Sequence, residues 1–176
     1  LNKATVGATA GAIVGAPAIV RAQAAIRWRL ASSFPKSLDT LFGTVEHVVQ
    51  RVGQITGGKF QISVHAAGEI VPPLQVLDAA QAGTIELAHT ALYYFFGKEP
   101  SWSLACAIPF GLNCRQYNSW WHYGGGGKLF NEFANKAAGV QAFLCGNTGA
   151  QMGGFFRKEI NTVEDLKGLK FRIAGM

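Results

Sequence analysis

The chain has 176 residues, of which 49% are hydrophobic and 15% are charged. This length suits a domain with a sizeable core, and the composition excludes a disordered or fibrous protein. The formal net charge of +6 is not concentrated in any run of five like charges or in a basic stripe with interleaved aromatic residues. Nucleic acid is therefore excluded as a partner, and the mild basicity is compatible with an anionic small molecule.

The first 24 residues have the pattern of an export signal. Lys3 precedes an uncharged stretch of small and apolar residues that is interrupted by Pro17, and Ala22-Gln23-Ala24 fits the pattern that signal peptidases cleave. The apolar stretch is too short and too rich in glycine for a membrane-spanning helix. We therefore predict a signal peptide over 1–24 and a periplasmic mature protein. The opening Leu-Asn-Lys also resembles the end of a twin-arginine signal, so export by that route is one hypothesis.

Residues 26–90 alternate between two kinds of periodicity. Apolar residues recur at every second position in three segments and at steps of three and four in two others, which predicts strands and amphipathic helices, respectively. The predicted strands are 26–34, 59–67 and 84–90, and the predicted helices are 38–55 and 72–83. The order β-α-β-α-β predicts an α/β fold with a mainly parallel sheet and helices on its faces.

The second half of the chain is less regular. Predicted helices cover 114–123 and 128–139, a short one follows Thr162, and predicted strands cover 140–149, 153–160 and 169–175. Four glycines at 124–127 precede Lys128, as in a phosphate-binding loop. That loop needs a serine or threonine after the lysine, whereas Leu129 follows here, so we interpret the glycines as a flexible lead-in to a helix.

The residues that usually carry catalysis or metal binding are scattered. Cys106, Cys114 and Cys145 form no CxxC pair, which favours three buried thiols, although a Cys106–Cys114 bridge stays open. His65 and His89 lie at or beside strand ends, where a structural role is favoured over a role in lining a cleft. No nucleophile motif or metal-ligand spacing is present, which argues against an enzyme.

Ligands of open α/β sheets bind beyond the carboxyl ends of the strands. Ser33 and Phe34 lie at the end of the first predicted strand, and Tyr93 and Tyr94 follow the third. A tyrosine offers both an apolar wall and a hydroxyl group that needs a partner when it is buried. These four residues are therefore candidate ligand-binding residues. For the two phenylalanines that follow the tyrosines, a place in the core and a place in the site fit the pattern equally well.

Arg172 lies near the end of the last predicted strand. Its guanidinium could bind a carboxylate by two parallel hydrogen bonds, although the alternating pattern alone favours an arginine on a half-exposed strand surface. Gln151 lies in a glycine-rich segment and, on the pattern alone, is an ordinary loop residue.

Several segments resemble the solute-binding proteins of TRAP (tripartite ATP-independent periplasmic) transporters. They are LKGLKFRIAG at 166–175, HAAGEIVPPLQVLDAAQAGTIELAHTA at 65–91, IPFGLNCRQYNSWWHYGGGGKLFNEF at 108–133 and GNTGAQMGGFFRKEI at 146–160. The last two are similar to the branch that binds 2-oxo acids and related monocarboxylates. The resemblance extends over residues 26–176.

The resemblance implies a type II periplasmic-binding-protein fold, in which two α/β lobes close over an organic acid. The first lobe would span 25–148, and 149–176 would form the hinge crossing and the start of a truncated second lobe, because the family runs to about twice this length. Arg172 would clamp the ligand carboxylate, and Gln151 would help to hold a sodium or calcium ion beside it. The resemblance also implies a membrane transporter as partner, no catalytic cofactor and, in some members, a homodimer.

These observations favour a periplasmic protein that captures a small organic acid, such as a 2-oxo acid or similar monocarboxylate, and performs no chemistry. The alternatives are an exported enzyme acting on an organic acid, a dicarboxylate-specific binding protein and, on the glycine run alone, a nucleotide-binding domain.

Overall fold

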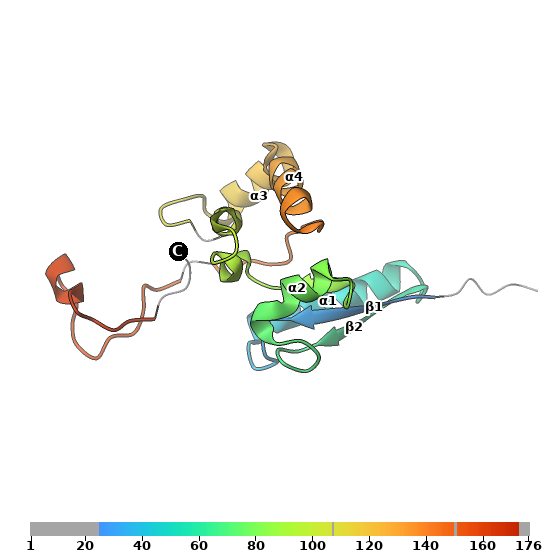
Figure 1. Ribbon diagram of the computed structural model, residues 1–176, viewed down its shortest axis with the longest axis horizontal. Coiled ribbons are helices and arrows are strands. Elements are labelled where there is room, and N and C mark those ends of the chain that lie inside the picture. The colour runs from blue at the N-terminus through green and yellow to red at the C-terminus, as the bar shows by residue number, and fades with distance from the viewer. Residues whose placement is uncertain (1–24, 107, 150, 173–176) are drawn as a thin grey trace, which may run out of the picture.

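The computed structural model describes residues 25–106, 108–149 and 151–172 (Figure 1). The predicted signal peptide lies outside the described residues. The strands are β1 (Ile26–Ser32), β2 (Phe60–His65) and β3 (Leu87–His89), and the α-helices are α1 (Asp39–Ile55), α2 (Val76–Gln81), α3 (Cys114–Tyr123) and α4 (Gly126–Ala138). Short 3₁₀ turns occupy Pro73–Gln75, Leu92–Phe95, Pro100–Ala105 and Val163–Leu166.

The three strands form a parallel sheet in the order β2-β1-β3. This arrangement confirms the predicted β-α-β-α-β unit, in which each helix carries the chain back to the start of the next parallel strand. Ile26 lies opposite Phe60, and Leu30 lies opposite Leu87. Helix α1 packs against β2, and α2 packs against β3. The carboxyl ends of β1 and β3 therefore lie side by side at one edge of the sheet.

Strand β3 and helix α2 are shorter than predicted. The backbone N–H of Thr84 donates to the Ala79 carbonyl at 2.9 Å, so this residue still belongs to the end of the helical turn. The side chain of Glu86 forms an ion pair with Arg29 at 2.8 Å, and the strand ladder starts only at Leu87. The alternating apolar pattern thus includes residues that are buried without being paired in the sheet.

One buried cluster joins the sheet to the helices that follow it. Its largest side chains are Phe95, which is 1% exposed, and Trp102, which is 2% exposed. The Trp102 ring makes edge contacts with Phe130 and Phe133 at centroid distances of 6.0 and 4.8 Å. The aromatic segment after β3 therefore supplies much of the core, although Phe96 remains 37% exposed.

The glycine run 124–127 is a packing contact between α3 and α4. Gly125 has a φ of +83°, which only glycine adopts without strain, and the helix already begins at Gly126. A Cβ atom on Gly126 would overlap the ring of Trp120, and one on Gly127 would lie 2.9 Å from the Trp121 carbonyl oxygen. The prediction of a lead-in before a helix at 128 was wrong, because two of the four glycines are helical residues that let α3 approach.

We expect Gly126→Ala to lower the free energy of unfolding by about 1–3 kcal/mol, because the added methyl group must displace the Trp120 ring. Gly53→Ala in α1 is the matched control. An added Cβ there meets nothing within 4 Å, so the higher helix propensity of alanine should raise stability by about 0.5–1 kcal/mol. Urea denaturation measures both, and equal effects of the two substitutions would contradict the packing role of Gly126.

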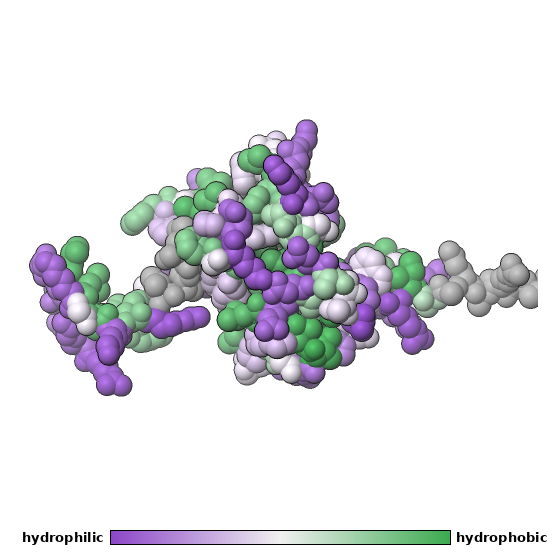
Figure 2. Space-filling view, in the orientation of Figure 1, coloured by the Kyte–Doolittle hydropathy of each residue, from purple (hydrophilic) through white to green (hydrophobic). Residues whose placement is uncertain are grey.

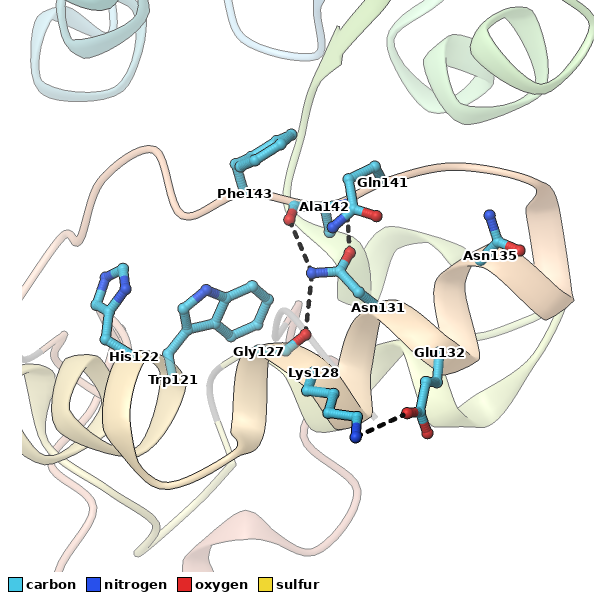
Figure 3. A pocket seen from close by; sticks show the side chains of 10 residues that line it. All are labelled: Trp121, His122, Gly127, Lys128, Asn131, Glu132, Asn135, Gln141, Ala142 and Phe143. Carbon is cyan, nitrogen blue, oxygen red and sulfur yellow. Dashed lines mark hydrogen bonds and ion pairs between the residues drawn. The ribbon is translucent and has the colours of Figure 1, made fainter.

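Three predicted strands are not formed in the part of the chain that the structure describes, namely 140–149, 153–160 and 169–172. A strand needs a second strand to pair its N–H and C=O groups, and sequence alternation does not show whether one is present. The backbone of Ala142 instead bonds to the side chain of Asn131 in α4. Its N–H donates to Oδ1 at 2.6 Å, and its carbonyl accepts from Nδ2 at 3.1 Å (Figure 3).

The predicted helix after Thr162 is reduced to the 3₁₀ turn Val163–Leu166. Thr162 is the residue before the turn, and the Asp165 carboxylate accepts hydrogen bonds from its N–H and its hydroxyl at 2.8 and 3.0 Å. The same bonds lower the pKa of Asp165.

The three cysteines are free. Cys106 and Cys145 are partly buried, whereas Cys114 is exposed at the start of α3. The prediction of three buried thiols was therefore wrong for Cys114. No helix within the described residues is both long and apolar enough to cross a membrane.

Residues 151–172 run out from the body of the molecule and turn back toward it (Figure 1). The two limbs of this excursion meet where Phe156 stacks on Phe171 at a centroid distance of 4.8 Å. Gly154 lies against the same ring, where a side chain would overlap Phe171. Figure 2 shows that the excursion carries both hydrophilic and hydrophobic side chains, and Phe155 is 88% exposed. The described part of the return limb ends at Arg172.

Candidate functional site

The candidate site lies at the sheet edge where β1 and β3 end. Ser32 is paired with His89 in the register of the two strands, and the N–H of Ser33 donates to the His89 carbonyl at 2.8 Å. Because parallel strands end at the same edge, the residues that follow β1 and β3 come together, as the sequence predicts.

Ser33 and Phe34 lie beneath the surface at this edge. The Ser33 hydroxyl lies 2.6 Å from the Pro73 carbonyl oxygen and 2.8 Å from the Thr90 hydroxyl. Since Ser33 is 8% exposed and both of these contacts are internal, its hydroxyl ties the two strand ends together. Phe34 is 6% exposed and packs against the ring of Tyr94 at a centroid distance of 6.1 Å.

Tyr93 and Tyr94 belong to the 3₁₀ turn Leu92–Phe95 that follows β3. Their rings meet edge to face at 4.9 Å, and both side chains are half-buried. Burial, followed by the neighbouring Tyr94, raises the pKa of Tyr93 to about 12. The Tyr93 phenol is therefore protonated at neutral pH and can donate a hydrogen bond.

Arg172 is exposed, and it forms no ion pair with another described residue. Its positive charge nevertheless lowers the pKa of Tyr93, against the larger effect of burial. The guanidinium thus lies within electrostatic range of Tyr93, although 78 residues of the chain lie between the two.

Gln151 is exposed in the outgoing limb of the C-terminal excursion. Its side-chain amide nitrogen donates to the Thr148 hydroxyl at 2.8 Å, which leaves the amide oxygen available to a ligand. No group of three histidine, cysteine or acidic side chains within the described residues could by itself hold a metal ion.

The sequence favours a structural role for His89, but the structure places its ring in contact with residues of the candidate site. Its Nδ1 atom lies 2.9 Å from the Ser32 hydroxyl, and its ring meets Phe34 edge to face at 5.2 Å. Burial lowers the pKa of His89 from 6.5 to about 4, so the imidazole is neutral at pH 7. The signal in the sequence was the position of His89 at the carboxyl end of a strand.

We expect the folded protein to lose stability as the pH falls from 6.5 toward 4. In this window the unfolded chain binds a proton at His89 that the folded state resists, so acidification favours unfolding. Between pH 7 and pH 5 the wild type should lose about 1–2 kcal/mol more than His89→Asn, which lacks the ionisable ring. Urea denaturation at both pH values measures this difference, and equal losses in the two proteins would contradict the burial of a neutral His89.

Two hollows lie outside the contacts described so far, and the smaller one adjoins Tyr93, whose backbone acts on the pKa of the lining residue Cys106. A cavity of about 180 Å³ is lined by Leu104, Cys106, Ile108, Leu112, Tyr117 and Trp120. A wider and more open hollow of about 800 Å³ lies over α4 and the extended segment after it (Figure 3). Lys128 and Glu132 face each other across 4.0 Å at its rim, and the Asn131 side chain bonds to the backbone of Gly127 and Ala142.

Comparison with known proteins identifies the family. Residues 31–176 match the family model described as bacterial extracellular solute-binding protein, family 7. The chain is 51% identical over 155 residues to a monocarboxylate 2-oxoacid-binding periplasmic protein of Nostoc sp. strain PCC 7120, covering 86% of this chain and 41% of that protein.

Two solved structures have the same fold. A TRAP transporter solute-binding protein from Bordetella bronchiseptica, a mixed-occupancy dimer with calcium and picolinate in one site, is 44% identical, with a TM-score of 0.83 over 87% of this chain and 45% of that chain. A protein from Pseudoalteromonas atlantica with bound sodium and pyruvate is 37% identical, with a TM-score of 0.82 over 86% of this chain and 46% of that chain.

The chain spans less than half the length of these relatives. The similarity nevertheless extends over most of its own residues, and the family match runs from the end of β1 through the C-terminal excursion. The chain therefore belongs to family 7 of the bacterial extracellular solute-binding proteins, the family of TRAP transporter solute-binding proteins.

Proposed function

We propose that the protein captures a small 2-oxo acid or related monocarboxylate in the periplasm and delivers it to the membrane subunits of a TRAP transporter. The observation that carries this proposal is the cluster of Phe34, Tyr93 and Tyr94 at the carboxyl edge of a parallel sheet, with the charge of Arg172 near enough to act on Tyr93. The 51% identity to a 2-oxoacid-binding relative, and the pyruvate in a 37% identical structure, support the choice of ligand.

In this proposal Arg172 holds the ligand carboxylate by two parallel hydrogen bonds. An unpaired guanidinium suits this role, because no internal carboxylate of the described residues competes for it. The protonated phenol of Tyr93 donates to a ligand oxygen, and Tyr94 forms an apolar wall. Phe34 and Ser33 support that wall from below.

The proposed organisation follows the two-lobed fold of the family. Residues 25–148 form the first lobe, and 149–176 cross the hinge and begin the second. Arg172 would then approach the first lobe from the second, so that ligand binding and closure of the hinge are coupled. Residues 1–24 direct export, with the twin-arginine route as one hypothesis, and a homodimer is proposed by analogy with the dimeric Bordetella relative.

A cation fits the proposed site in its donor chemistry. Sodium and calcium prefer oxygen ligands, and Gln151 presents an amide oxygen that its hydrogen bond to Thr148 leaves unused. Calcium takes six to eight oxygen ligands, so Gln151 would supply one and the bound acid others. The cation would neutralise part of the charge of the acid.

The protein is proposed to bind its ligand without converting it. Its relatives are named as binding proteins. The Ser32 hydroxyl, which lies 2.9 Å from Nδ1 of His89, is 0% exposed and therefore cannot attack a bound acid. An exported enzyme acting on an organic acid, or a binding protein specific for dicarboxylates, would be the alternative.

A melting-temperature screen of the purified complete gene product tests the proposal. We expect pyruvate and other 2-oxo monocarboxylates to raise the melting temperature, dicarboxylates to have little effect, and calcium or sodium to increase the shift. A larger shift with dicarboxylates would favour the alternative binding protein, and consumption of pyruvate would favour the enzyme. Absence of any shift with every acid would contradict the proposed function.

A further inference from the structure

We propose that His89 contacts the bound acid directly: its Nε2–H donates a hydrogen bond to the ligand, and the Ser32 hydroxyl fixes the tautomer that provides this donor. This inference rests on the proposed function, and it assigns a specificity-determining role to a residue for which the sequence favours a structural one.

The hydrogen bonds of Ser32 determine the tautomer. Its oxygen accepts from the N–H of Phe34 at 3.1 Å and lies 2.9 Å from Nδ1 of His89. Ser32 is 0% exposed, so its own hydrogen cannot go to water, and it has no other acceptor among the described residues. The hydroxyl therefore donates to Nδ1, because the opposite arrangement would leave a buried O–H unpaired. The proton of the neutral imidazole then lies on Nε2.

The second nitrogen of the ring is available to a ligand. His89 makes no other hydrogen bond to a described residue, and no side-chain nitrogen or oxygen in the described parts is both buried and unpaired. Nε2 is therefore accessible, on the side of the ring away from buried Ser32. Burial of the ring lowers the pKa of His89 to about 4, so this donor stays neutral at the pH of binding.

The surroundings of His89 are those of the candidate site. Its ring lies against Phe34, and Phe34 in turn lies against Tyr94. A neutral N–H donor in the same aromatic cluster as Tyr94 complements an acid with a second oxygen next to its carboxylate, which is the feature that distinguishes a 2-oxo or 2-hydroxy acid from a simple carboxylate. We therefore assign recognition of that second oxygen to His89.

Two substitutions separate the roles of the two ring nitrogens. Asparagine places an acceptor near the position of Nδ1 but nothing at Nε2, whereas glutamine places an amide N–H near Nε2 but leaves Ser32 without its acceptor. Pyruvate affinity is measured by calorimetry on the complete gene product, and the melting temperature of the unliganded protein reports stability. His65→Asn is the matched control, because His65 ends β2 and faces Glu69 at 3.9 Å instead of the candidate site.

We expect His89→Asn to weaken pyruvate binding about tenfold while it keeps the melting temperature. His89→Gln should bind within about threefold of the wild type and melt at a lower temperature, and His65→Asn should bind like the wild type. Unchanged affinity in His89→Asn, or equal weakening in both His89 variants, would overturn the inference. A wild type that does not bind pyruvate would contradict the proposed function instead, and this inference with it.

A second measurement does not depend on the folding of a variant. Spectra of the wild type labelled with ¹⁵N-histidine should show His89 protonated on Nε2, and addition of pyruvate should shift the Nε2 resonance more than that of Nδ1. A proton on Nδ1, or an Nε2 resonance that pyruvate does not move, would contradict a direct contact.

Discussion

Arg172→Ala should reduce the affinity for pyruvate about a hundredfold or more. The guanidinium is the only positively charged side chain that we place at the ligand, and removal of one partner from a hydrogen-bonded charge pair typically costs about 2–5 kcal/mol. Arg172→Lys should also weaken binding at least about tenfold, since an ammonium group keeps the charge but cannot form two parallel hydrogen bonds. Calorimetry on the complete gene product measures both affinities.

Arg157→Ala is the matched control for this prediction. Arg157 is an exposed arginine in the outgoing limb of the same C-terminal excursion, and it has no ion-pair partner among the described residues. Its removal changes the net charge by the same amount, so a general electrostatic attraction would weaken to a similar degree. A similar loss of affinity in both variants, or no loss in either, would contradict the assignment of Arg172 as a ligand-binding residue.

Phe95→Ala should lower the free energy of unfolding by about 3–5 kcal/mol. The Phe95 side chain is 1% exposed in the cluster that joins the sheet to α4, and truncation leaves a cavity that its close-packed neighbours cannot fill. Because natural proteins are stable by only about 5–15 kcal/mol, this loss should be visible as a large shift of the urea midpoint.

Phe110→Ala is the control for the loss of a phenyl ring. Phe110 is fully exposed, with a relative exposure of 109%, so its truncation should change stability by less than about 0.5 kcal/mol. Similar urea midpoints for Phe95→Ala and Phe110→Ala would contradict the position of Phe95 at the centre of the core.

The parallel sheet and its helices were predictable because their signals are local. The steps of three and four predict a helix at α1 and the alternation predicts a strand at β1, and the structure confirms both elements. Burial along β1 does not alternate, however: 26–29 are exposed and 30–32 are buried. The same reasoning failed for 140–149, where alternation shows an extended backbone but not the strand that would pair with it. Ala142 finds its backbone partner in the Asn131 side chain, which no periodicity reveals.

The candidate site was predictable only in part. The rule that ligands bind beyond strand ends selected Phe34 and Tyr94, and the structure places these residues in contact. Arg172 could not be connected to Tyr93 by pattern alone, because the connection depends on how the chain turns back after the excursion. The sequence favoured a structural role for His89. Its proposed role in the site depends on a hydrogen bond to Ser32, which forms only because of the register of β1 and β3.

The most direct test of the account is a crystal structure of the complete gene product with bound pyruvate. We expect both terminal nitrogens of Arg172 to lie within hydrogen-bonding distance of the two carboxylate oxygens, with the ligand held between this side chain and Tyr93. A structure in which the Arg172 guanidinium points into solvent while pyruvate is bound elsewhere would contradict the proposed clamp.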